Sequence, residues 1–195
     1  MRTDGTPHKP VTIGIVGLGR AGWMLHLETA AADERFRPVA VVDPLEERVE
    51  EAEKQFGVKG YTRLGEMLAS TEMELVVVAS PSQCHFADAR AVLDSGRHCV
   101  VEKPMAGNIL EAEELLQLAR EKGRRLFLNH TMVYSPVMRQ IRQVVERGVL
   151  GPLFQLRAYY GGYLRRWDWQ TLRKYDGGVL PNKGWHFLSR MLLLM

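Results

Sequence analysis

The sequence has few cysteines and no long apolar run, and both absences limit what the protein can be. Cys84 and Cys99 are the only cysteines among 195 residues, and they fall in a helical and a strand pattern. We therefore expect buried, reduced thiols and a cytoplasmic location, not a disulfide-stapled secreted fold. No apolar run is long enough to cross a bilayer, and residues 1–10 are polar, which predicts a loose tail and not a signal peptide.

The chain also lacks a strong excess of either charge. It has 26 Lys and Arg residues against 23 Asp and Glu residues, for a net charge of +3, and the basic residues are scattered. These features do not support a nucleic-acid surface, and we expect no membrane partner and no metal site. A hydrophobic content of 46% is typical of a globular protein, and the length suffices for one full domain and part of a second.

What the chain does contain is a glycine turn between a strand and a helix. Val11–Val16 is a β-branched run typical of a buried strand, and Gly17, Gly19 and Gly22 follow it with the spacing G-x-G-x-x-G. In this context the motif predicts dinucleotide binding. Gly17 would make the tight turn, Gly19 would let a pyrophosphate approach the backbone, and Gly22 would let the helix pack on the strand.

An acidic residue supports this prediction. The next strand, 38–43, ends in Asp43, which lies about 20 residues past the third glycine, where a carboxylate accepts ribose hydroxyls. Asp43 would repel a 2′-phosphate, so the sequence favours NAD over NADP. Ala21 and Arg20 complete the cofactor-binding turn, and Arg20 is either a phosphate contact or a solvated turn residue. The alternative to the whole motif is a glycine-rich turn without a ligand.

Strands and helices alternate from residue 11 to residue 131, and this order predicts a doubly wound, parallel Rossmann sheet of the α/β class. Residues 132–195 have a different pattern, which indicates the start of a second unit. Its expected elements are a helix at 136–147, a strand at 153–160, a long loop at 161–178 and a helix at 184–195.

Two turns lie where parallel strands of the predicted sheet end. One is Ser80-Pro-Ser-Gln-Cys-His85, and the other is Glu102-Lys-Pro104. Ligands of open α/β sheets bind outside the carboxyl ends of the strands, so we expect both turns at the cofactor crevice. Lys103 directly follows a buried strand and is either a charge that needs a partner or ligand, or an ordinary solvated turn lysine.

Together with residues 17–22, these turns and the segment 177–186 resemble the Gfo/Idh/MocA family of oxidoreductases. The resemblance implies NAD(P) bound by the first domain, with Ser80, Pro81, His85, Glu102 and Lys103 at the cofactor. It implies that Lys103 hydrogen-bonds the reacting hydroxyl of a sugar, polyol or cyclitol.

The resemblance also implies a role for the last helix. His186 would be the general acid or base, and Asn182 stands four residues before it, where many members carry Asp. Family members are much longer, so the resemblance implies that residues 132–195 are the start of an incomplete α+β substrate domain. Either the true product is longer or this chain is a form truncated at its C-terminus, and a full-length form is expected to be a homo-oligomer.

The loop at 161–178 carries two tryptophans that are candidates for substrate contact. Trp167 and Trp169 flank Asp168, and such side chains suit the faces and hydroxyls of sugars; the alternative is that they only pack the loop. Two other functions remain open for the chain. One is a dinucleotide-binding fragment or regulator without turnover, and the other is a methyltransferase, against which the Glu102-Lys-Pro104 turn argues.

Overall fold

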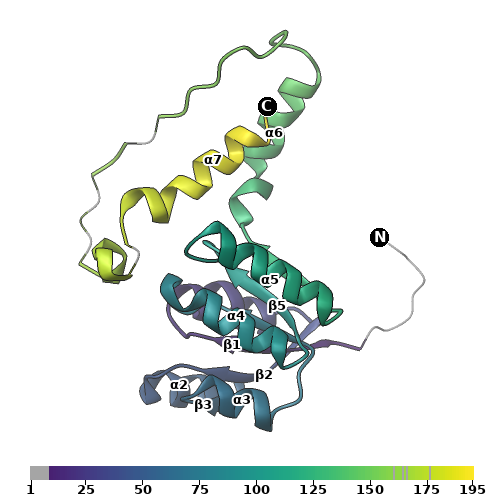
Figure 1. Ribbon diagram of the computed structural model, residues 1–195, viewed down its shortest axis with the longest axis vertical. Coiled ribbons are helices and arrows are strands. Elements are labelled where there is room, and N and C mark those ends of the chain that lie inside the picture. The colour runs from purple at the N-terminus through teal and green to yellow at the C-terminus, as the bar shows by residue number, and fades with distance from the viewer. Residues whose placement is uncertain (1–8, 160, 164, 166, 176) are drawn as a thin grey trace. The chain divides into compact units, whose positions relative to one another are not determined.

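The computed structural model describes residues 9–159, 161–163, 165, 167–175 and 177–195, and the chain divides between Leu128 and Asn129 into two compact units (Figure 1). The tail predicted at residues 1–10 therefore lies almost wholly outside the described residues. No helix of the described residues is both long enough and apolar enough to cross a membrane.

The first unit contains a six-stranded sheet with the strand order β3-β2-β1-β4-β5-β6. The pairs β1–β2, β1–β4, β2–β3 and β4–β5 are parallel. This arrangement confirms the predicted Rossmann sheet, because the order reverses at β1 and places a crevice at the carboxyl ends of β1 and β4. The strands are β1 Val11–Val16, β2 Phe36–Val42, β3 Lys59–Tyr61, β4 Leu75–Val78, β5 His98–Glu102 and β6 Leu126–Asn129.

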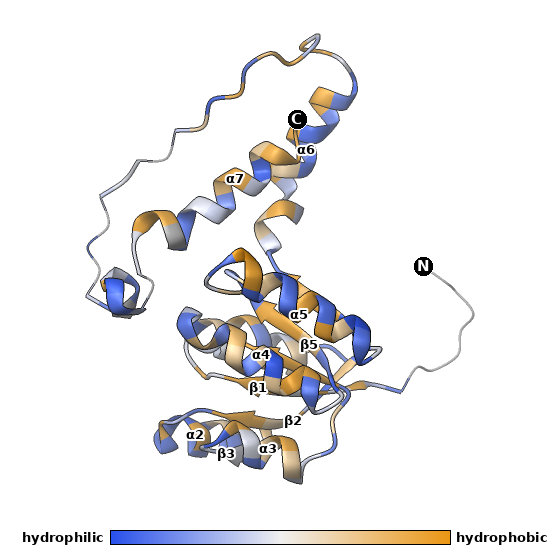
Figure 2. Cartoon of the chain, viewed as in Figure 1, coloured by the Kyte–Doolittle hydropathy of each residue, from blue (hydrophilic) through white to orange (hydrophobic). Residues whose placement is uncertain are grey.

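Helices cover both faces of this sheet. One core layer joins Met67 of α3, Val92 of α4 and Leu115 of α5, and the other joins Leu27 of the π-helix η1 to Val49 of α2. Strand residues alternate between the two layers, as expected for a doubly wound sheet. Figure 2 shows the apolar residues along its strands. The helices of this unit are η1 Ala21–Leu27, α1 Glu28–Ala31, α2 Glu46–Phe56, α3 Leu64–Ser70, the 3₁₀ turn η2 Ser82–Cys84, α4 His85–Asp94 and α5 Ile109–Glu121.

The ends of the longer helices follow local chemistry. Asn108 caps α5 by accepting the Glu111 amide at 3.0 Å, and the Glu111 carboxylate accepts the Gly107 amide at 2.9 Å. This reciprocal pair satisfies amides at the start of the helix that have no intrahelical partner. Gly57 ends α2 with a φ of 66°, a left-handed conformation that glycine adopts without strain.

The second unit is mainly helical. Ser135 caps α6 through the Met138 amide, and Pro136 occupies the first turn, where its missing N–H costs nothing. The helices are the 3₁₀ turns η3 Thr131–Tyr134, η4 Trp169–Thr171 and η5 Arg173–Tyr175, the α-helices α6 Pro136–Glu146 and α7 Trp185–Leu192, and the π-helix η6 Leu180–Gly184.

The strand predicted at 153–160 is wrong for residues 153–159, which form no regular structure; residue 160 lies outside the described residues. The side chains of Phe154 and Tyr159 are 97% and 95% exposed. A strand must pair its backbone amides and carbonyls with a neighbour, and the described part of the second unit offers no strand to pair with here. The apolar alternation of this segment therefore does not produce a strand on its own.

Candidate functional site

The glycine turn after β1 is closed on one side and open on the other. A Cβ at Gly17, whose φ is 85°, would lie 2.7 Å from the Ser80 amide nitrogen, and one at Gly22 would lie 1.7 Å from the Gly17 carbonyl oxygen. A Cβ at Gly19 would meet nothing within 4 Å. Gly17 and Gly22 are therefore required by the packing of the turn, whereas the side of the turn at Gly19 is open.

The helix that follows the turn starts as the π-helix η1 and continues as α1. Trp23 donates its amide to the Gly19 carbonyl at 2.9 Å, which closes the first helical turn. The amides before Trp23 lie at a helix N-terminus, where free N–H groups and the helix dipole favour phosphate oxygens. Arg20 lies exposed beside them and Ala21 half-buried, so the arginine has the freedom to reach a phosphate.

Asp43, directly after β2, is only 3% exposed. Its Oδ2 accepts the Leu18 amide at 2.7 Å and lies 3.4 Å from Nη1 of Arg48, while its Oδ1 accepts the Leu45 amide at 3.0 Å. The carboxylate thus ties the glycine turn to the start of α2. A carboxylate has about four acceptor positions, so these contacts leave little capacity for a ribose hydroxyl.

An open pocket lies beside Asp43, at the turn between β2 and α2. Its volume is about 490 Å³, within the range of small-molecule sites. It is lined by Pro44, Leu45, Glu46, Glu47 and Thr62. Because two of these side chains are carboxylates in the first turn of α2, the pocket is electrostatically unfavourable for an additional phosphate.

The turn after β4 is fixed by a buried histidine. His85 is 2% exposed, with Nε2 2.8 Å from the Ser80 carbonyl oxygen and Nδ1 2.6 Å from the Pro104 carbonyl oxygen. Ser80 also donates its hydroxyl to Oδ2 of Asp88 at 2.6 Å. Burial raises the pKa of Asp88, and the Ser80 hydrogen bond and the charge of His85 oppose that rise. His85 therefore contacts the neighbouring turns, and Pro81 and Gln83 are the exposed residues of this turn.

The turn after β5 contains Lys103, half-buried, followed by a cis peptide bond to Pro104. On the other side of Lys103, the Oε1 of Glu102 lies 2.9 Å from Nε2 of His26, and both side chains are nearly buried. His26 belongs to η1, so this contact joins the glycine-turn helix to the lysine turn. The structure thus gathers Gly19, Asp43, Ser80, Glu102 and Lys103 at the carboxyl edge of one sheet.

The residues expected to handle the proton lie in the second unit. His186, on α7, has its ring centroid 5.1 Å from that of His130, with the ring planes tilted by 37°. Nε2 of His130 lies 3.4 Å from the hydroxyl of Ser189. Asn182, on η6, donates its side-chain amide to Oε1 of Gln170 at 2.7 Å. Within this unit the structure therefore places a second histidine beside the predicted one.

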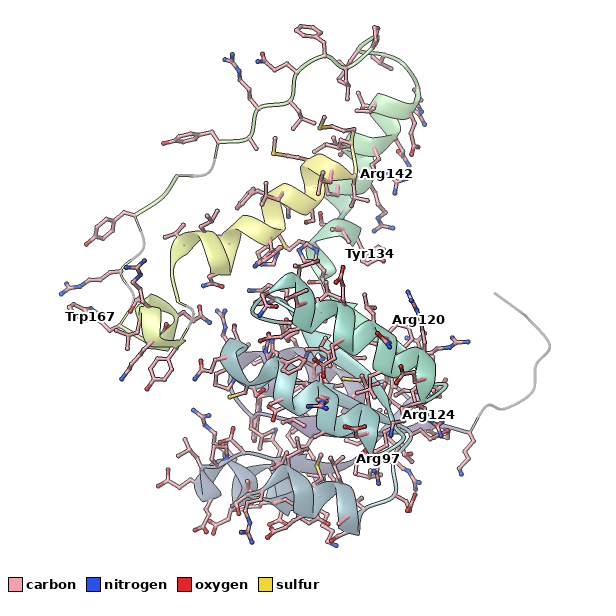
Figure 3. The ribbon with its side chains drawn as sticks, in the orientation of Figure 1. Arg97, Arg120, Arg124, Tyr134, Arg142 and Trp167 are labelled. Atoms are coloured by element: carbon pink, nitrogen blue, oxygen red, sulfur yellow. The ribbon has the colours of Figure 1, made fainter. Side chains whose placement is uncertain are left out.

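The tryptophan candidates are described only in part. Trp167 is 84% exposed, and the guanidinium of Arg165 lies 5.2 Å from the centroid of its ring (Figure 3). The side chain of Trp169 lies outside the described residues. The indole of Trp167 is therefore exposed and lies against a cation, and its contact with substrate stays a prediction.

Two histidines that the sequence did not single out contact predicted site residues: His26 meets Glu102, and the ring of His130 lies beside that of His186. His130 comes directly after β6, and His26 stands four residues beyond the last glycine of the motif. The position after a strand is a usable signal for His130, because that is where ligands of open sheets bind. No local sequence pattern marks His26, because its partner Glu102 is 76 residues away in the sequence. No group of three or more His, Cys, Asp or Glu residues suited to a metal ion occurs in the described part of the chain.

Both cysteines are free thiols. Cys99 on β5 is fully buried, and burial raises the pKa of its thiol to about 12. Cys84, in η2, is half-buried, and burial also raises the pKa of its thiol. The expectation of reduced and buried thiols therefore holds fully for Cys99 and in part for Cys84.

Comparison with known proteins agrees with this geometry. The chain is 26% identical over 187 residues to a scyllo-inositol 2-dehydrogenase (NADP(+)) of Bacillus subtilis, an alignment that covers 94% of this chain and 51% of the relative. A scyllo-inositol dehydrogenase of Lactobacillus casei, solved with NAD(H) and scyllo-inositol, has a TM-score of 0.68 and 26% identity over 73% of this chain and 43% of its own. A biliverdin reductase of Synechocystis, solved with biliverdin and NADP+, has a TM-score of 0.81 and 30% identity over 94% of this chain and 57% of its own.

The chain spans about half the length of the curated relatives that it matches. Residues 11–130 contain the glycine turn at 17–22, the buried Asp43 after β2 and the turn with Lys103 after β5. The same residues match the family described as "Oxidoreductase family, NAD-binding Rossmann fold". This chain therefore belongs to the Gfo/Idh/MocA family of oxidoreductases.

Proposed function

We propose that this chain binds a nicotinamide dinucleotide at the carboxyl edge of its sheet and serves a dehydrogenase that acts on a secondary hydroxyl of a sugar, polyol or cyclitol. The open space at Gly19, between two glycines that the packing requires, is the observation that carries the proposal. It fits a pyrophosphate lying against backbone amides. The inositol dehydrogenases among the relatives support the substrate class.

Three residues would handle the substrate. The ammonium of Lys103 would hydrogen-bond the reacting oxygen and stabilise negative charge that develops there. His186 would take the hydroxyl proton in the oxidation direction, a task that suits an imidazole near neutral pH. Asn182, which precedes His186 on the same helical segment, would hold a neighbouring hydroxyl through its amide. When bound, the nicotinamide ring would accept or supply the hydride.

The acidic lining of the pocket beside Asp43 supports NAD as the preferred cofactor. The 2′-phosphate of NADP would bring further negative charge toward Glu46, Glu47 and the buried Asp43 carboxylate. Arg48 lies close enough to Asp43 to offset part of this repulsion, but its guanidinium is already engaged by that carboxylate. We therefore expect NADH to bind more tightly than NADPH.

Titration with NADH and NADPH, followed by nicotinamide fluorescence, tests the binding step. A panel of polyols, cyclitols and biliverdin with the preferred cofactor then tests turnover. Lys103→Met should keep NADH affinity within about threefold while hydride transfer falls by about a hundredfold or more. Lys54→Met, on the exposed last turn of α2, is the matched lysine control and should behave as wild type.

Each part of the proposal has its own contrary result. A folded protein that does not bind NADH would overturn the cofactor site. Binding of NADH without turnover of any polyol or cyclitol would favour a non-catalytic dinucleotide-binding chain, and turnover of biliverdin alone would overturn the substrate class.

A further inference from the structure

The contacts of the buried His85 ring bear on its protonation state. Its two ring nitrogens face two backbone carbonyl oxygens, that of Ser80 at 2.8 Å and that of Pro104 at 2.6 Å. A carbonyl oxygen only accepts hydrogen bonds, so each of these contacts needs an N–H on the histidine side. A neutral imidazole has one N–H and would direct its remaining lone pair at a carbonyl oxygen. Both contacts are hydrogen bonds only in the imidazolium form.

The groups around the ring are compatible with a buried positive charge. Asp88 lies one turn further along α4, interacts electrostatically with His85, and accepts the Ser80 hydroxyl. Asp88 also interacts electrostatically with the thiols of Cys84 and of Cys99 on β5, and burial keeps both thiols in their neutral form. A buried cation is tolerated where a carboxylate and hydrogen-bond acceptors surround it, and His85 has all of these.

The same contacts decide the position of Lys103. The residue after it, Pro104, is bound through its carbonyl to His85, and the residue before it, Glu102, is bound through its carboxylate to His26. His85 also holds the Ser80 turn, which packs directly against Gly17 of the glycine turn. One ring thus links the lysine turn to the turn that supports the predicted pyrophosphate site.

We propose that His85 is a positioning residue that acts as an imidazolium: it donates one hydrogen bond to the Ser80 carbonyl and one to the Pro104 carbonyl, and so holds Lys103 in place. The placement of Lys103 relative to a nucleotide rests on the proposed function, whereas the doubly protonated ring does not. His85 therefore need not touch the cofactor to affect its chemistry.

Nuclear magnetic resonance of the chain with ¹⁵N-labelled histidine tests the first part directly. The chain has six histidines, and the signals missing from His85→Gln identify those of His85. At about pH 8, where ordinary histidines are neutral, both ring nitrogens of His85 should carry a hydrogen. A pyridine-type signal from either nitrogen would overturn the proposal. If His85→Gln does not fold, substitution of the other five histidines one at a time assigns the same spectrum.

Acylation of Lys103, measured by peptide mass spectrometry, tests the second part without a cofactor. The rate at Lys103, relative to the other lysines, should change several-fold in His85→Gln. It should stay at the wild-type value in His98→Gln, a matched control at the opposite end of β5, where His98 accepts the Arg125 amide at 3.0 Å. An unchanged Lys103 rate in His85→Gln would overturn the positioning role.

The effect on cofactor and turnover separates this proposal from the proposed function. With the positioning role intact, His85→Gln should bind NADH within about threefold of wild type and lose tenfold to about a hundredfold in hydride transfer, as expected for a displaced catalytic group. Failure of the wild-type chain to bind NADH would contradict the proposed function. It would not affect the protonation state of His85, which the NMR experiment measures without a cofactor. Normal hydride transfer in His85→Gln would contradict the positioning role alone.

Discussion

The substitution Gly19→Ala separates the binding role of the glycine turn from its folding role. A Cβ at Gly19 meets no atom within 4 Å, and the residue does not adopt a positive φ. The alanine variant should therefore fold with unchanged or slightly higher stability, by about 0.4–1 kcal/mol, because the unfolded chain loses freedom. The same methyl would occupy the space where we propose that a pyrophosphate lies, so the Kd for NADH should rise tenfold or more, or about 1.4 kcal/mol.

Two other glycines provide the comparison. Gly22→Ala would place a Cβ 1.7 Å from the Gly17 carbonyl oxygen, so the turn must move, and the overpacking should cost about 1–3 kcal/mol or more. Gly65→Ala, at an exposed position of α3, also meets nothing within 4 Å and should affect neither the fold nor NADH binding.

Urea denaturation and NADH fluorescence titration of the three variants measure both quantities. Wild-type NADH affinity in Gly19→Ala would refute the argument that a pyrophosphate lies against this residue. A loss of stability in Gly19→Ala equal to that in Gly22→Ala would refute the argument that this side of the turn is open.

Three further predictions concern the first unit. Leu115→Ala removes a fully buried side chain of the α3–α5 core layer and should lower the free energy of unfolding in urea by about 2–5 kcal/mol; a loss below about 1 kcal/mol would contradict the packing. Glu74 accepts the Thr12 amide at 3.1 Å, which lowers the pKa of its carboxyl group, so its stabilisation is present above the unfolded pKa and is lost as the pH falls through the folded one. The stability difference between wild type and Glu74→Gln should accordingly shrink in acid, and a difference that grows there would contradict this sign. Cys99 should resist iodoacetamide in the native protein and react only on unfolding, as followed by peptide mass spectrometry; native labelling would contradict its burial.

The first unit could be predicted from sequence because its signals are local and consistent. The β-branched runs 11–16 and 75–78 are buried on both faces, and each is followed by a turn and a helix. Parallel strands need this strand, turn and helix order, so alternation along the chain predicted the sheet. The positions of Gly17 and Gly22 followed from the same motif, and their close contacts agree with it.

What could not be predicted depends on contacts between distant residues. The segment 153–159 has the alternation of a strand, but pairing with another strand decides whether one forms. His26 meets Glu102, and His130 meets His186, across separations that periodicity does not report. The π-helical start of η1 could not be predicted either, because apolar residues at helical spacing do not distinguish a π-helix from an α-helix.

The buried carboxylate of Asp43 has a consequence for redesign of cofactor preference. Replacing the acid after β2 is an obvious way to admit a 2′-phosphate, but here it would also release the Leu18 and Leu45 amides. On the proposed preference for NAD, engineering toward NADP should therefore keep Asp43 and neutralise Glu46 and Glu47, which line the pocket. At this edge of the sheet, the negative charge near the pocket can be reduced in α2 while the Asp43 carboxylate still holds the Leu18 and Leu45 amides.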